Sequence, residues 1–159
     1  MRAKVYIETS VVSYLTARPS RDVVAAAHQQ ISLDWWERRR NDFDLVASLH
    51  VINEAGLGNP EMAQRRLALL AGIPLLQVTE TAQELAVAIV KKGLLPQTAY
   101  PDALHIATAA VHQIDYLLTW NCTHIANAEI LPRVALIAER FGLTLPYICT
   151  PEELLGDPQ

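Results

Sequence analysis

Residues 5–15 read VYIETSVVSYL and place a glutamate directly after a short apolar run. The alternation up to Glu8 is typical of a β-strand, and Thr9 and Ser10 begin a helical pattern that continues to about Ala17. An ionised carboxylate removed from water costs several kcal/mol unless it is paired, hydrogen-bonded or bound to a metal. Glu8 therefore needs a partner.

The composition predicts one globular domain over residues 1–159, because 51% of the residues are apolar and 19% are charged. Glu8 interrupts the first apolar run too early for a signal peptide, and no later run is long enough for a membrane span. We therefore expect a soluble, cytoplasmic protein. Cys122 and Cys149 lie far apart and form no CxxC pair, so the sequence favours reduced thiols over a disulfide or a zinc knuckle.

A net charge of −4 argues against a protein that coats nucleic acid by bulk electrostatics. Local basic groups are still present, although basic residues commonly cover solvated helix faces. Arg18, Arg21 and Arg38 are the candidates that we name for contacts with nucleic acid.

Strand patterns alternate with helix patterns along the whole chain. Ser20, Ser48 and Asn59 are candidate helix caps, and Thr81 with Glu84 forms a capping-box pattern. This alternation predicts an α/β three-layer sandwich, in which helices flank a mostly parallel central sheet of four to five strands. The predicted strands are 4–8, 44–48, 74–78, 116–119 and 145–148, and the predicted helices are 9–17, 20–40, 48–55, 59–72, 81–93, 101–114 and 128–141.

Polar residues just after strands matter most, because ligands of parallel sheets bind at the carboxyl ends of the strands. Glu8 and Asn121 hold such positions, Glu54 lies on the helix after the second strand, and Asp102 is in the first turn of a later helix. Carboxylates gathered at one edge repel one another unless a divalent cation neutralises them, which favours Mg²⁺ or Mn²⁺. Each residue also has a structural explanation: Asp102 suits a helix N-terminus, Asn121 suits a turn, and the start of the first helix could offset the charge of Glu8.

Two histidines share a helix face with Asp102. His105 and His112 follow it at spacings of three and of a further seven residues. The HExxH pattern is absent, and hydrogen-bonded histidines on half-buried faces are more common than metal ligands. The sequence therefore disfavours a zinc site on this helix.

Four motifs, in this order and at these separations, resemble the PIN-domain ribonucleases, and in particular the VapC-type toxins. They are YIETSVVSYL, INEA, YPDALHIATAA and LLTWNCTHIAN, and the likeness spans roughly residues 4–150. The resemblance implies a metal-dependent endoribonuclease that cleaves RNA phosphodiester bonds as the toxin of a toxin-antitoxin pair. It also implies a homodimer and a small antitoxin protein as partner.

The resemblance also implies roles for the polar residues. Glu8, Glu54 and Asp102 would hold Mg²⁺ or Mn²⁺, and Asn121 would orient a water molecule or a second ion. Hydrogen bonds that support the ligands would come from Thr9, Ser10 and Thr119.

Glu8 and Asn121 depart from the commonest family pattern, which has aspartate at the first of these positions and often at the fourth. These departures motivate an alternative, a PIN-like domain that binds RNA or protein without cleavage. A phosphatase-like domain is disfavoured, because it would need an aspartate nucleophile where Glu8 stands.

Overall fold

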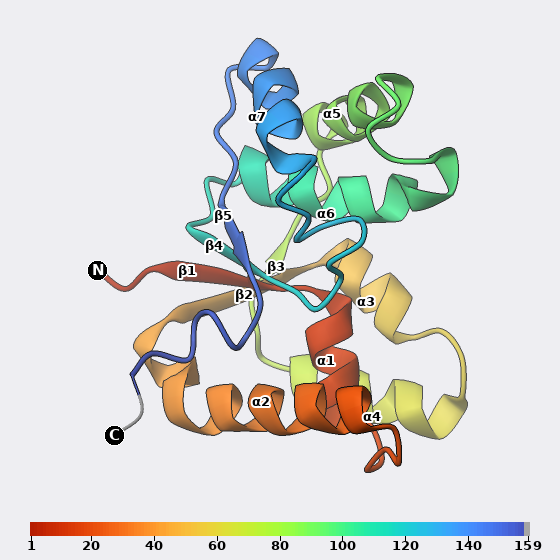
Figure 1. Cartoon of the computed structure of the whole chain (residues 1–159), viewed down its shortest axis with the longest axis vertical. Coiled ribbons are helices and arrows are strands. Elements are labelled where there is room, and N and C mark those ends of the chain that lie inside the picture. The colour runs from red at the N-terminus through yellow and green to blue at the C-terminus, as the bar shows by residue number, and fades with distance from the viewer. Residues whose placement is uncertain (158–159) are drawn as a thin grey trace.

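The computed structural model describes residues 1–157, and its centre is a parallel five-stranded sheet in the order β3-β2-β1-β4-β5 (Figure 1). Tyr6 on the central strand aligns with Val46 on one neighbour and Leu117 on the other. The strands are β1 (Lys4–Ile7), β2 (Asp44–Ser48), β3 (Leu75–Leu76), β4 (Tyr116–Leu118) and β5 (Tyr147–Cys149).

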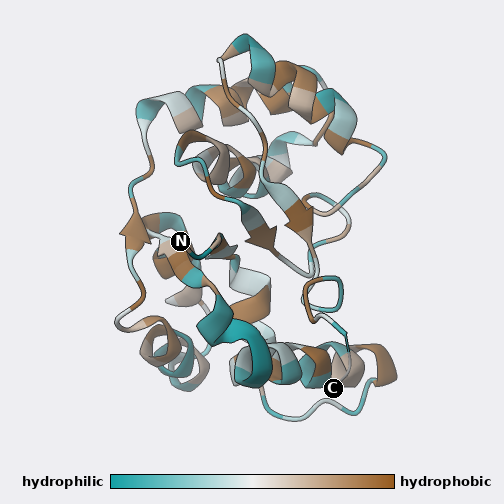
Figure 2. Cartoon of the chain, turned by 90° about the vertical axis from the view of Figure 1, so that its left-hand side faces the viewer, coloured by the Kyte–Doolittle hydropathy of each residue, from teal (hydrophilic) through white to brown (hydrophobic). Residues whose placement is uncertain are grey.

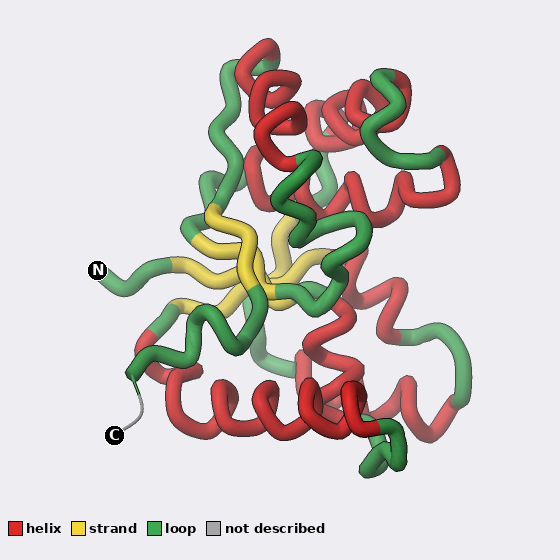
Figure 3. Tube along the Cα trace, viewed as in Figure 1, coloured by secondary structure: helices red, strands yellow, loops and turns green. Residues whose placement is uncertain are grey.

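Helices cover both faces of this sheet, as the sequence predicts (Figure 3). On one face lie α1 (Thr9–Thr16), α2 (Val23–Arg39) and α4 (Pro60–Leu70), and on the other lie α5 (Glu80–Lys91), α6 (Tyr100–Val111) and α7 (Leu131–Arg140). The short α3 (Leu49–Ala55) follows β2 directly. The three-layer α/β architecture is therefore confirmed.

The core lies between the sheet and each helical layer, and the strands stand out as hydrophobic in Figure 2. Val5, Tyr6 and Ile7 are completely buried, because β1 is central and both of its faces are covered. The stretch 103–110 of α6 is also buried, and its alanines allow close packing against α5. None of the helices within residues 1–157 is long and apolar enough to cross a membrane.

Several predicted helix ends are correct. Ser48 Oγ accepts a hydrogen bond from the backbone of Val51 at the start of α3, and Asn59 caps α4 through two backbone N–H groups. Cys122 and Cys149 are free thiols, as the sequence predicts.

Two predicted caps are wrong. Asp22, and not Ser20, caps α2, since its carboxylate accepts from the backbone N–H of Ala25. Thr79 caps α5 through the N–H of Ala82, two residues before the predicted Thr81. In both cases a second residue whose side chain can accept the capping hydrogen bond lies within two positions, and the tertiary fold selects between the two residues.

β3 pairs over only two residues, whereas five were predicted, because it lies at the edge of the sheet.

The order in which the chain adds strands to the sheet reverses between β1 and β4. From β1 the chain continues to β2 on one side, and from β4 it continues to β5 on the other. Parallel sheets bind ligands at the carboxyl ends of such neighbouring strands. Glu8 and Thr119 are the residues that directly follow β1 and β4.

Candidate active site

Glu8 is buried, with 5% of its surface exposed, and its carboxylate accepts three hydrogen bonds. Oε2 accepts from the backbone N–H of Ser10 at 2.9 Å, and Oε1 accepts from the hydroxyls of Ser10 at 2.5 Å and Thr119 at 2.6 Å. Glu8 is also the N-cap of α1, so the positive end of that helix faces its charge. The helix that follows the strand is therefore one partner of Glu8, and the hydroxyls are others.

Glu54 lies on α3 and faces the same imidazole as Glu8. Its Oε1 accepts from the hydroxyl of Thr9 at 2.6 Å and lies 2.5 Å from Nε2 of His105. The same nitrogen of His105 lies 4.0 Å from Oε2 of Glu8. The two carboxylates are therefore brought together around one ring nitrogen.

His105 is completely buried on α6, and both of its ring nitrogens have partners. Nδ1 lies 2.7 Å from the hydroxyl of Tyr6, which lies 2.8 Å from Oγ of Ser48. When the ring is neutral and Nε2–H donates to the carboxylate of Glu54, the Tyr6 hydroxyl donates to Nδ1 and Ser48 donates to Tyr6. The hydroxyl of Tyr6 can reverse these roles, because it both donates and accepts.

His50 lies one helical turn before Glu54 on α3 and close to His105. The two imidazole rings are 4.3 Å apart between centroids. Nε2 of His50 donates to the carbonyl of Pro101 at 2.9 Å and lies 3.9 Å from Oε2 of Glu54. Each of the three residues His50, Glu54 and His105, here called the His-Glu cluster, offers one donor atom, and these atoms lie within 4.8 Å of one another.

Charge and burial shift two pKa values in this cluster. Burial is the main cause that lowers the pKa of His50, and the neighbouring His105 lowers it further. Burial raises the pKa of Glu54, but the hydrogen bond and charge of His105 and the bond from Thr9 together outweigh it, so the pKa lies below its ordinary value. Glu54 is therefore ionised at neutral pH.

Asp102 and Asn121 meet at His124. Asp102 is in the first turn of α6, and its Oδ2 lies 3.0 Å from Nδ1 of His124. Asn121 Oδ1 accepts from the backbone N–H of His124 at 2.9 Å, so Asn121 also serves the turn role weighed from the sequence. Segment 119–124 after β4 thus binds Glu8 through Thr119 and Asp102 through His124, which places both carboxylates at the same edge of the sheet.

No protein-family model matches the sequence, and no curated protein matches it. Solved structures do match. VapC20 of Mycobacterium tuberculosis, described as a sarcin-ricin loop cleaving toxin, superposes with a TM-score of 0.60 at 16% identity and covers 78% of this chain and 95% of its own. The chain has the VapC-type PIN fold.

Two further structures share this VapC-type fold. A chain of VapBC2 from Rickettsia felis, solved with a promoter DNA fragment, matches with a TM-score of 0.58 at 15% identity, covering 92% of this chain and 98% of that one. A toxin-antitoxin complex from Klebsiella pneumoniae matches with a TM-score of 0.56 at 19% identity, covering 92% and 97%. The fold that the four sequence motifs indicated is therefore confirmed.

His50, Glu54 and His105 offer donor atoms that could hold a metal ion, and two of these atoms are imidazole nitrogens, whereas the sequence analysis named oxygen ligands. Glu8 is not one of these three residues, but its Oε2 lies 4.0 Å from Nε2 of His105. Oxygen ligands suit Mg²⁺, while imidazole suits the later first-row metals. Asp102 makes no contact with Glu8 or Glu54 among the hydrogen bonds and ion pairs of residues 1–157. Its charge only opposes the lowering of the pKa of His50.

The sequence analysis did not identify His50 or His124. A usable pattern was present for His50, since the spacing of four residues to Glu54 returns to the same helix face. Nε2–H of His112 donates to the carbonyl of Gln77 at 2.8 Å, and His112 lies outside the His-Glu cluster.

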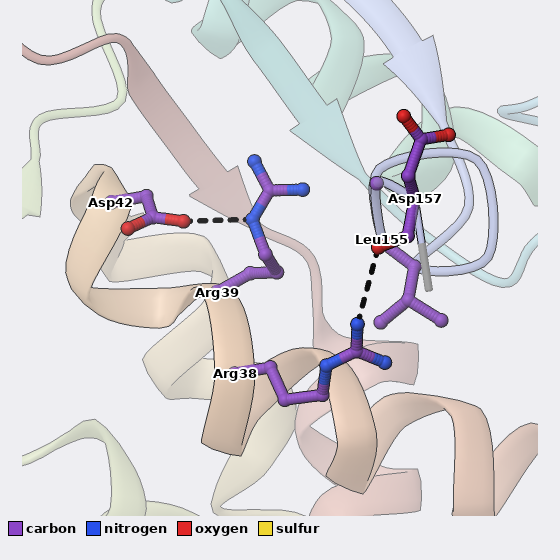
Figure 4. A pocket seen from close by; sticks show the side chains of 6 residues that line it. Arg38, Arg39, Asp42, Leu155 and Asp157 are labelled. Atoms are coloured by element: carbon purple, nitrogen blue, oxygen red, sulfur yellow. Dashed lines mark hydrogen bonds and ion pairs between the residues drawn. The ribbon is translucent and has the colours of Figure 1, made fainter. Parts of the chain in front are cut away.

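The three candidate arginines do not gather at this site. Arg18 pairs with Glu61 at 3.0 Å, and Arg21 is exposed in the loop between α1 and α2. Arg38 lies at the C-terminal end of α2, near the opposite edge of the sheet, and lines a pocket of about 610 Å³ with Asp42 and Asp157 (Figure 4). The pocket is therefore separate from Glu8, Glu54 and Asp102.

Proposed function

We propose that the protein is a divalent-metal-dependent endoribonuclease that hydrolyses RNA phosphodiester bonds as the toxin of a toxin-antitoxin pair. The observation that carries this proposal is the pair Glu8 and Glu54, both within 4.0 Å of one nitrogen of His105 at the carboxyl edge of the sheet. The fold supports it, since one protein that shares the fold is described as cleaving the sarcin-ricin loop.

Glu8, Glu54 and Asp102 are the residues proposed to hold the ion. A bound divalent ion would supply a water of lowered pKa and would offset charge on the phosphate. The hydroxyls of Thr9, Ser10 and Thr119 fix the carboxylates by hydrogen bonds. His124 orients Asp102, and Asn121 holds the segment in place through the backbone of His124. The chain thus presents its acidic groups in set directions.

RNA would reach this edge through local positive charge, because the protein as a whole is acidic. Arg18 and Arg21, in the exposed loop after α1, are the proposed contacts with the RNA backbone. Arg38 is left out of the proposal, because its guanidinium bonds to the carbonyl of Asp157 near the opposite edge.

A homodimer and a small antitoxin that covers the site complete the proposal. Its support is that two structures with the same fold are a VapBC complex and a toxin-antitoxin complex. Sedimentation over a rising protein concentration tests the dimer, and a protein that stays monomeric throughout would contradict it.

The substitution Asp102→Asn tests the proposed activity. It removes a charge while keeping an acceptor for His124, so we expect cleavage to fall at least about 100-fold with the fold intact. Cleavage of a labelled RNA and circular dichroism report the two properties. Asp42→Asn is the matched control, since Asp42 is exposed near the opposite edge, and it should cleave normally. Full activity of Asp102→Asn in nuclease-free preparations would reject the assignment.

A second function is favoured by the hydrogen bonds of the carboxylates. Glu8 already accepts three bonds and Glu54 two, so both charges are accommodated by protein groups alone. Such a site suits a PIN-like module that binds RNA or protein without cleavage. Calorimetric titration decides between the two functions, because a protein that binds no divalent ion at millimolar concentration cannot be the metal-dependent nuclease.

A further inference from the structure

The His-Glu cluster joins two elements that are far apart in the sequence. His50 and Glu54 lie one turn apart on α3, which directs both side chains to the same side of that helix. His105 comes from α6, fifty-one residues after Glu54. Figure 1 shows α3 and the N-terminal end of α6 at the same end of the sheet.

Neighbouring groups hold the ligand atoms of the cluster in place. Nε2–H of His50 donates to the carbonyl of Pro101, which orients the ring and leaves Nδ1 as its nitrogen with a free lone pair, and the hydroxyl of Tyr6 orients the ring of His105. If Nε2 of His105 binds a cation, Nδ1–H must donate to Tyr6, and Tyr6 can then donate to Ser48. The same contacts therefore satisfy His105 with and without a bound ion, which is typical of the outer contacts of metal-binding histidines.

Glu8 adds a fourth group. Its Oε2 accepts one backbone N–H and lies 4.0 Å from Nε2 of His105, so this oxygen keeps a free lone pair toward the cluster. His105 and Glu8 are both almost fully buried, with 1% and 6% of their side chains exposed. Two imidazoles and two carboxylates in a partly dry setting resemble the donor sets of transition-metal sites more than those of magnesium sites.

We propose that His50, Glu54 and His105, assisted by Glu8, form a site for a first-row transition ion, which binds there in preference to Mg²⁺. The inference deepens the proposed function, on which it rests for the location of the ion. It assigns the type of ion through two nitrogen ligands that an all-carboxylate site would lack. Affinity should rise from Mn²⁺ to Co²⁺ and Zn²⁺, in the order usual for nitrogen-containing sites.

Calorimetric titration of the metal-free protein with MgCl₂, MnCl₂, CoCl₂ and ZnCl₂ tests this assignment without RNA. We expect one site per chain, at which Zn²⁺ and Co²⁺ bind at least about tenfold more tightly than Mg²⁺. His50→Gln should weaken Zn²⁺ and Co²⁺ binding by about tenfold or more and leave Mg²⁺ binding nearly unchanged. The visible absorption of bound Co²⁺ should change in the same variant, because it loses a nitrogen ligand.

His112→Gln is the matched control, because His112 lies on α6 but bonds to the carbonyl of Gln77, outside the cluster. It should bind all four ions as the unmodified protein does. His105→Gln carries the risk of misfolding, since His105 is buried, so the more exposed His50 is the deciding position. Equal affinity for Mg²⁺ and Zn²⁺, or Zn²⁺ binding that His50→Gln leaves intact, would overturn the assignment.

RNA cleavage, measured in parallel, separates this inference from the proposed function. Cleavage without histidine-dependent metal binding would reject the transition-metal site and keep the nuclease. Histidine-dependent metal binding with no cleavage of RNA would keep the site and reject the nuclease.

Discussion

Glu8 shows how a carboxylate can be stable although it is almost fully buried. The charge of Glu8 is stabilised by the N-terminal end of α1, by two hydroxyls and by a backbone N–H. The folded chain therefore accommodates the carboxylate before any cation binds. Thr119 supplies one of these hydroxyls from the neighbouring strand β4. The metal-free protein should therefore fold without added ions.

The lowered pKa values of His50 and Glu54 predict that acid destabilises the metal-free protein. The unfolded chain takes up a proton at His50 more readily than the folded chain does, so stability should fall as the pH drops below the ordinary histidine value of 6.5. Glu54 has the same sign: its contribution is present above its ordinary value of 4.5 and is lost as the pH falls through the lower, folded value.

Urea denaturation in the presence of a chelator, repeated over this pH range, measures the effect. His50→Gln should flatten the upper part of the profile and leave the lower part in place. If the free energy of unfolding instead rises as the pH falls below 6.5, the prediction is wrong, because a half-buried His50 that is neutral in the folded chain requires it to fall.

Sequence reasoning could find the residues whose positions are marked by a local pattern. Glu8 and Asn121 come just after strands, Asp102 is in the first turn of a helix, and Glu54 lies on the short helix after β2. The contact between His105 and Glu54 could not be found in this way, because it depends on how α3 and α6 meet at the end of the sheet. Nothing in the spacing between those two residues encodes that distance.

At the scale of elements, α3 decides the geometry of the site. It is short and is capped by Ser48, whose hydroxyl accepts from Val51 and also contacts Tyr6. His50 and Glu54 lie within the first two turns after this cap. The cap thus connects the start of α3 to the ring of His105 through a single tyrosine.

Ser48→Ala should lower both the stability and the metal affinity of the protein. Loss of the cap and of the buried bond to Tyr6 should cost about 1–3 kcal/mol of unfolding free energy. Thr79→Ala removes a comparable cap from α5, which carries no residue of the site, so it should cost about 1 kcal/mol and leave Zn²⁺ binding unchanged. Denaturant unfolding and calorimetry on both variants make the comparison, and equal loss of affinity in the two would contradict a specific role for α3.

Element boundaries were predictable where a residue type leaves little choice. Strands β1 and β2 follow from apolar runs, and β2 ends at Ser48, which caps α3. Asn59 marks the start of α4 in the same way. The caps of α2 and α5 were missed because several capping residues compete within a few positions. The length of strand β3 was overestimated, because only two residues of the apolar run at the sheet edge pair with β2.

At the scale of the whole molecule, the strand order positions the site. β1 and β4 are neighbours although more than one hundred residues separate them, and both deliver their following residues to one edge. The helices α3 and α6 add Glu54 and Asp102 at that edge. The order of the strands, which local patterns do not specify, is what converts scattered polar residues into a site.

We propose that the layers fold together as one domain over residues 1–159. The central strand is buried by both helical layers, so neither layer keeps a complete core when separated from the other. Thermal unfolding followed by far-ultraviolet circular dichroism and by tryptophan fluorescence should give coincident transitions. Trp35 reports on the layer of α2, and a fluorescence transition clearly displaced from the helical one would indicate separate units.

Anomalous diffraction from a crystal of the metal-free protein soaked in MnCl₂ tests most directly whether the acidic edge is a cation site. A strong peak should lie in contact with Glu54, His105 and Glu8. Peaks confined to surface carboxylates such as Glu61, with the side chains of the cluster unmoved, would contradict the metal-dependent mechanism.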